Sequence, residues 1–181
     1  MKLNVVYADF VSKYNKPFKY SFFASKILDR FFSYLQGYNY SKYWKRREYV
    51  VSGRGNFILK CYCFLWLKRV DAKNHCSFGT SINNGARFAT PPILEHGPSG
   101  IIIGHDASIG SFCRIFQQVT IAQGNVVIGD NVLIGAGAKI LPNVTVGNNV
   151  KIGANCVVVE DLPDNSTCVL QKPRIITNHK M

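Results

Sequence analysis

The sequence lacks the segments that carry a chain into or across a membrane. Its first residues, MKLNVVYADFVSKYNK, contain no apolar run followed by a small-residue cleavage site, which a secretory signal requires. The most apolar stretch, residues 57–67, is too short to span a bilayer and is interrupted by Lys60. We therefore expect a cytoplasmic protein, with peripheral contact at the inner face of the membrane as a further prediction that rests on charge.

Paired cysteine motifs are also missing. The 6 cysteines show no CxxC spacing, so the sequence predicts neither a zinc site nor a disulfide framework. Cys113 and Cys156 occupy small-residue positions of the repeat described below. A buried thiol there acts as a compact apolar filler, and we expect both cysteines to be structural.

Acidic residues are scarce, and the imbalance lies at one end of the chain. Residues 1–75 contain 15 lysines and arginines against 4 acids, whereas residues 76–181 contain 7 against 6, and the net charge is +12. A basic N-terminal region favours an anionic partner: membrane phospholipid, a diphosphate-linked substrate, or the phosphates of a nucleotide cofactor. A solvated basic face without a specific partner is the alternative. No nucleic-acid recognition motif accompanies the charge, so we expect no nucleic-acid partner.

A six-residue repeat dominates the second half of the chain. An aliphatic residue recurs at every sixth position between Ile103 and Val158, with one seven-residue step from Ile121 to Ile128. The repeated residues are Ile103, Ile109, Ile115, Ile121, Ile128, Ile134, Ile140, Val146, Ile152 and Val158. Glycine often follows the aliphatic, and a small or β-branched residue stands four places after it.

A period of six indicates a β-solenoid. It does not fit the 3.6-residue period of an amphipathic helix, but it keeps the alternation of a strand because six is a multiple of two. The simplest fold with this pattern is a triangular coil, in which each side uses one hexapeptide and the inward aliphatic stacks on that of the next coil. Glycine and small residues should turn the corners. Cys76, Ile82, Phe88 and Leu94 extend the same register toward the N-terminus.

The residues before the repeat predict helices. Phe23, Ile27, Phe31 and Leu35 give residues 21–36 an amphipathic pattern, and residues 38–51 and 56–70 predict two further helices. The last of these is nearly all apolar and should bury against the β-solenoid or another subunit. The predicted organisation is a basic α-helical extension over residues 1–75, a mainly β solenoid domain over residues 76–176, and a tail over residues 177–181.

The register of the repeat breaks twice, near residues 95–102 and 122–127. Regular hexads build scaffold, so functional residues are expected at the breaks. Among the four histidines, His96 alone lies in a break, beside Glu95. His105 lies within a regular hexad, and His75 and His179 lie outside the repeat.

The segments LEHGPSGIIIG, FQQVTI and IGAGAKI are similar to the serine acetyltransferase branch of the hexapeptide-repeat acyltransferases, which includes related capsule and exopolysaccharide O-acetyltransferases. The resemblance covers residues 76–176. It implies a left-handed parallel β-helix, a homotrimer, and acetyl-CoA as acyl donor without a metal. It also implies that His96 is the general base of direct acetyl transfer in a ternary complex, and that Glu95 corresponds to an acid that contacts the substrate.

The resemblance further implies a groove in which pantetheine lies against backbone flanked by small residues. The matching positions here are Ala136, Gly137, Ala138, Gly153 and Ala154. Lys139, Lys151, Lys172 and Arg174 are candidates to bind the CoA phosphates, with a solvated surface role as the alternative for each lysine.

Two departures from the branch bear on the acceptor. Ser81 stands where the branch has an aspartate that orients the histidine from fifteen residues before it, and Asn83, Asn84 or a backbone carbonyl are the candidates to replace that aspartate here. Residues 122–126 (AQGNV) replace a longer loop that carries an Arg-His pair. Without that cation a buried amino-acid carboxylate would lose its partner. The sequence therefore predicts O-acetylation of a sugar hydroxyl of a polysaccharide or its precursor. Serine O-acetylation and a non-catalytic trimeric scaffold are the alternatives. The spacing of His75, His96 and His105 does not match the zinc ligands of β-helical carbonic anhydrases.

Overall fold

Two helices precede the β-strands in the computed structural model, which describes residues 37–171. Helix α3 is Tyr40–Val51, and the side chain of Asn39 accepts a hydrogen bond from the N–H of Lys42 at its start. Helix α4 is Phe57–Lys73, and Asn56 caps it in the same way through the N–H of Leu59. Both predicted helices are confirmed, whereas the helix expected at 21–36 lies outside the described residues. None of the described helices is long and apolar enough to cross a membrane.

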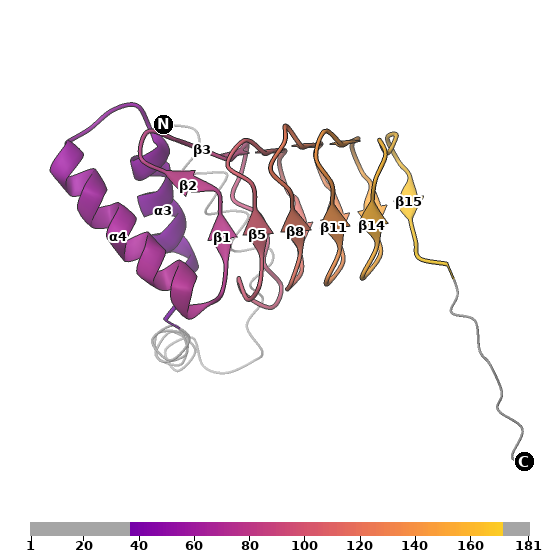
Figure 1. Cartoon of the computed structure of the whole chain (residues 1–181), viewed down its shortest axis with the longest axis horizontal. Helices are drawn as coiled ribbons and strands as arrows, with labels where there is room; N and C mark the ends of the chain where they lie inside the picture. The colour runs from indigo at the N-terminus through magenta and orange to yellow at the C-terminus, as the bar shows by residue number, and fades with distance from the viewer. Residues whose placement is uncertain (1–36, 172–181) are drawn as a thin grey trace, which may run out of the picture. The chain divides into compact units, whose positions relative to one another are not determined.

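The strands are two residues long and recur in the successive coils of the chain (Figure 1). Their bounds are β1 Ser77–Phe78, β2 Thr80–Ser81, β3 Asn84–Gly85, β4 Arg87–Phe88, β5 Ile102–Ile103, β6 Ser108–Ile109, β7 Arg114–Ile115, β8 Thr120–Ile121, β9 Val127–Ile128, β10 Leu133–Ile134, β11 Lys139–Ile140, β12 Thr145–Val146, β13 Lys151–Ile152, β14 Val157–Val158 and β15 Thr167–Cys168. All of them except β2 and β3 pair in parallel with strands of neighbouring coils.

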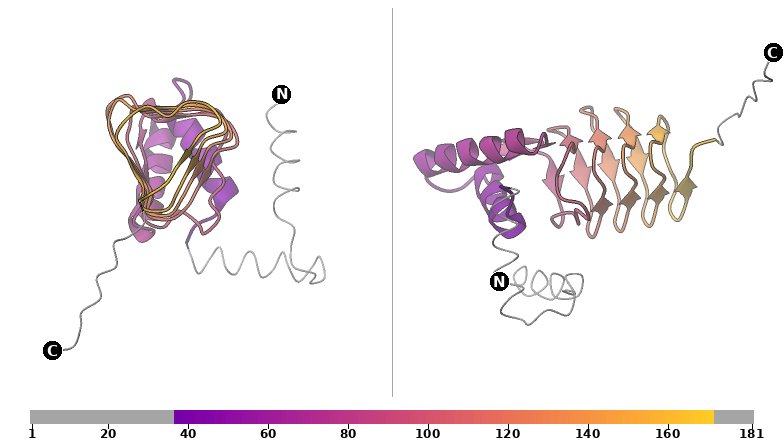
Figure 2. Two further views of the ribbon diagram at one scale, coloured as in Figure 1. Left: turned by 90° about the vertical axis from the view of Figure 1, so that its right-hand side faces the viewer. Right: turned by 90° about the horizontal axis from the view of Figure 1, so that it is seen from below.

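Three parallel sheets form the sides of the coil (Figure 2, left). Sheet 1 has the order β1-β5-β8-β11-β14, sheet 2 has β4-β6-β9-β12, and sheet 3 has β7-β10-β13-β15. The chain visits sheets 1, 2 and 3 in turn, so successive strands along the sequence lie on different sides. The predicted parallel β-helix of hexapeptide repeats with an α-helical N-terminal part is confirmed.

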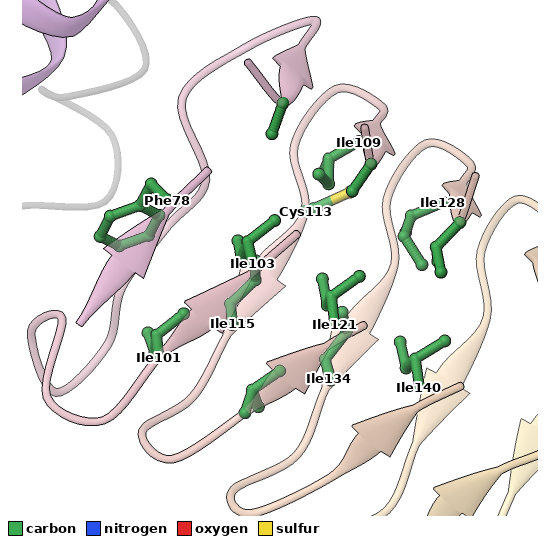
Figure 3. Packing of buried hydrophobic residues seen from close by; sticks show 14 of the residues in the cluster. Phe78, Ile101, Ile103, Ile109, Cys113, Ile115, Ile121, Ile128, Ile134 and Ile140 are labelled. Atoms are coloured by element: carbon green, nitrogen blue, oxygen red, sulfur yellow. The ribbon is translucent and has the colours of Figure 1, made fainter. Parts of the chain in front are cut away.

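The repeated aliphatic residues fill the inside of the coil. Sheet 1 places Ile103, Ile121 and Ile140 in one column, because each pairs with its counterpart in the next coil. These side chains are at most 1% exposed and point inward together (Figure 3). The small-residue positions, including Cys113 and Cys156, are buried as well, which confirms their role as fillers. Burial raises the pKa of the Cys113 thiol to about 11, which keeps it protonated.

The register predicted for the first hexads is wrong at Ile82. Residues 80–85 form an antiparallel hairpin of β2 and β3, with Asn83 at the turn in the left-handed conformation (φ 62°). The sequence NNG favours such a turn over a coil side. Phe78, rather than Cys76, aligns with Ile103 at the start of sheet 1. Ile82 matched the six-residue spacing only by coincidence.

Asparagine, more than glycine, turns the corners of the coil. Residues with positive φ recur at the corners, and among them are Asn125, Asn131, Asn143, Asn149, Asn155 and Asn165. Asparagine tolerates this conformation better than other residues with a side chain. At the corner between sheets 2 and 3, Asn131 donates to Asn149 at 2.9 Å and Asn149 donates to Asn165 at 3.1 Å. These amide bonds tie successive coils together at their outer rim.

A buried arginine joins helix α3 to the first coil. Arg47 is 4% exposed, and its guanidinium donates to the carbonyl oxygens of Phe78 at 2.9 Å and Ala86 at 2.6 Å. It also donates to the hydroxyl of Thr80 at 3.1 Å, and it lies over the ring of Phe88. Burial lowers the pKa of Arg47 to about 10, so the side chain stays charged at neutral pH. Helix α3 therefore caps the N-terminal end of the β-helix through polar contacts.

A buried acid lies beside this cap. The Tyr43 hydroxyl donates to Oδ1 of Asp71 at 2.5 Å, whereas Oδ2 of Asp71 has no hydrogen-bond partner. Burial raises the pKa of Asp71 above its ordinary value, and the hydrogen bond from Tyr43 offsets that only in part. An acid whose pKa is raised by folding contributes stability at low pH and loses it as the pH rises through the folded-state pKa.

Asp71→Asn should therefore flatten the pH dependence of stability. We expect the wild type to lose free energy of unfolding relative to the variant as pH rises from about 4 to about 8, because only the wild type must ionise a buried carboxyl. Urea unfolding at several pH values measures this difference. Glu160→Gln, at an exposed position, is the control and should keep the wild-type slope. An Asp71→Asn slope equal to that of the wild type would contradict the burial argument.

Candidate active site

His96 lies on the edge where the chain passes from sheet 3 back to sheet 1. We call this the His96 edge; it consists of residues 94–101, 116–119, 135–138 and 153–156. In the regular coils the corner is short, but at residues 94–101 three additional residues make it bulge. Gly97 (φ 75°) and Gly100 (φ 69°) adopt the left-handed conformation that forms the bulge. The insert thus displays its side chains outside the regular coil.

Glu95 and His96 project from this bulge and are both exposed. The His96 ring packs against Phe116 of the next coil, with 5.7 Å between ring centroids. Nε of Arg114 lies 3.6 Å from a carboxylate oxygen of Glu95, and the two side chains are 38% and 36% exposed. An imidazole, a carboxylate and a guanidinium therefore share one surface.

The backbone of the predicted CoA groove lies on the same edge, in the coils that follow. Hydrogen bonds connect its coils in sequence: Gln118 N–H to Ser99 carbonyl at 3.0 Å, Gly137 N–H to Gln117 carbonyl at 3.0 Å, and Asn155 N–H to Ala136 carbonyl at 2.8 Å. Ala136 and Gly137 are half-buried, and Ala154 is exposed. The structure thus brings His96, Ala136, Gly137, Gly153 and Ala154 onto one continuous strip. That they bind CoA stays a prediction.

The remaining candidates for CoA are placed differently. The side chain of Ala138 faces the core, its N–H donates to Gly135, and its carbonyl accepts from Thr120, so it offers the groove no group of its own. Lys139 is exposed on β11, and its ammonium donates to the carbonyl of Gln118 at 3.0 Å. Lys151 is exposed on β13. Lys172 and Arg174 lie outside the described residues.

Comparisons with known proteins identify relatives of the β-helix. The family described as "Bacterial transferase hexapeptide (six repeats)" matches residues 125–159. Serine acetyltransferase of Synechococcus elongatus is 38% identical over 105 residues, which are 54% of this chain and 43% of that protein. Residues 125–159 of the β-helix thus match the hexapeptide-repeat transferase family.

Among solved structures, this hexapeptide-repeat domain is similar to serine acetyltransferases. Serine acetyltransferase isoform 3 of Entamoeba histolytica, in complex with cysteine, is 33% identical with a TM-score of 0.56 and covers 65% of this chain and 43% of its own. The Neisseria gonorrhoeae serine acetyltransferase in complex with serine is 34% identical with a TM-score of 0.50 and covers 62% and 48%. This chain therefore spans less than half the length of these relatives.

The hexapeptide-repeat domain places Ser81 away from His96. Ser81 lies in the β2–β3 hairpin after sheet 1, on the edge between sheets 1 and 2, where its hydroxyl lies 3.1 Å from Nδ1 of His105. Within one chain, Ser81 therefore cannot orient His96 as the aspartate at this position was expected to do. Asn83, another candidate, accepts a hydrogen bond from Lys60 instead.

The second register break lies on that same edge. Asp106 accepts hydrogen bonds from the N–H groups of Gly124 and Asn125, at 2.9 and 3.1 Å, which hold the short 122–126 segment against the preceding coil. These two donors lower the pKa of Asp106. Hydrogen bonds to Asp106 therefore account for the conformation of the second register break. Within one chain, this break lies on a different edge from His96.

Arg114 is the site residue that the sequence reasoning missed. Arg114 precedes the inward-facing Ile115 on β7, so strand alternation directs its side chain outward. Its backbone forms a parallel β-bridge with Ile93 of the preceding coil, next to the insert. Counting residues along the repeat could have found this position. Among residues 37–171, no group of three or more histidines, cysteines and acids is arranged to hold a metal ion.

Proposed function

We propose that this protein is an acetyl-CoA-dependent O-acetyltransferase in which His96 is the general base. The observation that carries the proposal is the position of His96, which projects from the only bulged corner of the His96 edge in the described residues, above the small-residue backbone of the following coils. The similarity to serine acetyltransferases supports the same reaction. Ala136, Gly137, Gly153 and Ala154 would line the pantetheine, with Lys139, Lys172 and Arg174 as candidates for the phosphates.

The chemistry needs a base because an alcohol is a weak nucleophile at neutral pH. His96 in its neutral form accepts the proton of the acceptor hydroxyl while the oxygen attacks the thioester carbonyl of acetyl-CoA. The carbon–sulfur bond then breaks, and the imidazolium returns the proton to the CoA thiolate. The products are an O-acetyl ester and free CoA, with no acyl-enzyme. Cys156, the cysteine of the His96 edge, is buried and is not placed to act as a nucleophile.

A homotrimer would complete this site. His96 and Glu95 are exposed in the single chain, whereas acetyl transfer is favoured where bulk water is excluded. A neighbouring β-helix packed against the His96 edge would supply the second wall of the groove. The predicted trimer thus gives a reason for an exposed catalytic residue.

The comparisons favour L-serine as acceptor over the sugar that the sequence predicted first. The relatives are named serine acetyltransferases, and one of the similar structures contains serine. The structure adds a reason of its own: Glu95 and Arg114 offer an anion and a cation side by side near His96, which suits the ammonium and carboxylate of an amino acid. Arg114 would replace the cation that the short 122–126 loop lacks. An ion pair this exposed contributes little stability, so the two side chains can turn to a ligand.

CoA release from acetyl-CoA tests the proposal, with L-serine compared against nucleotide sugars and oligosaccharides. We expect release that depends on L-serine. Release only with a glycan would overturn the acceptor assignment and restore the sugar acceptor while leaving acetyl transfer intact. Absence of release with every acceptor would overturn the enzymatic proposal and favour the non-catalytic scaffold.

Arg114→Gln should raise the KM for L-serine by about 10- to 100-fold with little change in kcat, because a charge-assisted hydrogen bond of about 1.5–3 kcal/mol is lost in both the ground state and the transition state. Steady-state kinetics measures the two constants separately. Arg87→Gln, exposed on sheet 2, is the matched control and should behave as wild type. An unchanged KM in Arg114→Gln would remove Arg114 from the acceptor site.

A further inference from the structure

Helix α4 exposes an apolar surface that no described residue covers. Phe57, Ile58, Leu59, Tyr62 and Leu65 are 65%, 79%, 50%, 60% and 68% exposed. We call these five residues the α4 outer face. Ile58, Tyr62 and Leu65 follow the spacing of one helical stripe, on the side away from the buried Cys63 and Leu67. A contiguous exposed apolar stripe on a helix marks an interaction surface.

Cations are abundant on the two helices that carry this apolar stripe. Within residues 40–73, seven lysines and arginines are exposed or half-buried, whereas Glu48 is the exposed acid. The cations are Lys42, Lys45, Arg46, Arg54, Lys68, Arg69 and Lys73. The Arg46 guanidinium lies 4.1 Å from the ring centroid of Trp66, and the Lys42 ammonium lies 5.5 Å from it. The same guanidinium lies 5.9 Å from the ring centroid of Tyr62, so basic and aromatic side chains meet at the α4 outer face.

The orientation of α4 leaves this surface uncovered by the other residues in the range 37–171. Helix α4 packs on α3, and α3 in turn contacts the β2–β3 hairpin, so both helices stand at the N-terminal end of the β-helix (Figures 1 and 2). The opposite side of α4 faces α3 and the first coil. Its buried residues are Lys60, Cys63, Leu67, Val70 and Asp71. The α4 outer face occupies residues 57–65, whereas the contact with the His96 edge lies just past the other end of the helix, where the carbonyl of Asn74 accepts from the N–H of Gly100 at 3.3 Å. The use of this face does not depend on the proposed reaction.

We propose that the α4 outer face binds the surface of an anionic lipid bilayer. A helix with apolar and aromatic residues on one side and lysines and arginines around them lies in the headgroup region, with the apolar side chains among the acyl chains. Cations near an anionic leaflet add attraction to the burial of apolar area. A second copy of this chain is a poorer partner, because pairing two such faces would bring their lysines and arginines together, and like charges repel.

Vesicle co-sedimentation of the full chain tests this surface. The probes are vesicles of phosphatidylcholine alone and of an equal mixture of phosphatidylcholine and phosphatidylglycerol. We expect at least about tenfold more protein on the anionic vesicles, and release as the salt concentration rises. The double variant Ile58→Ser/Leu65→Ser should lose binding. The matched control, Val159→Ser/Val169→Ser, changes side chains that are 65% and 70% exposed on the C-terminal part of the β-helix and should bind as wild type.

Other results would overturn the proposal. Equal loss in both double variants, equal binding to neutral and anionic vesicles, or no binding at all would each contradict it. Light scattering provides an independent check, since a smaller assembly in Ile58→Ser/Leu65→Ser alone would assign the face to a second copy. A melting temperature lowered by several degrees in that variant alone would show that the same chain covers the face.

Discussion

His96→Ala should lower CoA release from acetyl-CoA by about 100- to 10,000-fold, the usual contribution of a general base. The loss should fall on kcat, because the imidazole acts on the proton that moves in the transition state. The side chain is exposed and its ring contact is with Phe116, so its removal should leave the fold and the assembly unchanged. Steady-state kinetics together with light scattering measures both effects.

The matched control is His75→Asn, which removes an exposed imidazole that precedes β1. Asparagine suits this position because His75 has a φ of 51°. The control should retain wild-type turnover. His96→Ala with unchanged turnover would exclude His96 as the base and would favour the scaffold, whereas a change of assembly state in His96→Ala would assign the residue a structural role.

Arg47→Met should destabilise the protein by about 2–5 kcal/mol, the largest stability effect that we expect at a single residue. Methionine keeps much of the volume of the side chain but leaves the carbonyl oxygens of Phe78 and Ala86 buried without their donors. Each buried unsatisfied carbonyl costs about 1–3 kcal/mol. The contact of the guanidinium with the ring of Phe88, at 4.5 Å, is lost as well.

Urea unfolding followed by circular dichroism measures this loss. Arg87→Met is the control, because Arg87 is exposed on β4 and its replacement should change stability by less than about 0.5 kcal/mol. If both variants unfold at the same urea concentration, α3 does not cap the β-helix through Arg47.

The β-helix could be predicted from the sequence because its coils repeat the same register. Residues such as Ile121 and Ile140 meet across neighbouring coils, so a constant spacing in sequence becomes a column in space. The register of the first coil could not be predicted from this spacing. Ile82 satisfied the spacing, but local turn chemistry at Asn83 and Asn84 formed a hairpin, and no pattern in a period of six distinguishes the two outcomes.

Candidate site residues that a break in the repeat marks could be predicted from the sequence, whereas contacts between residues of neighbouring coils could not. His96 stood out because a break in a regular repeat is visible in the sequence. The pairing of Glu95 with Arg114 joins neighbouring coils through exposed side chains, and the separation of Ser81 from His96 depends on which edge each one occupies. Arg47 likewise lies in a run of basic residues, and the composition of that run does not indicate that its side chain is buried against the first coil.

A structure of the protein in complex with CoA would show which edge of the β-helix binds the cofactor, and it therefore tests whether His96 lies at the active site. We predict that pantetheine lies along the His96 edge against Ala136 and Gly137, with the sulfur beside the imidazole of His96. CoA bound on the edge that carries Ser81 and His105, with no contact to the His96 edge of any subunit, would contradict the account.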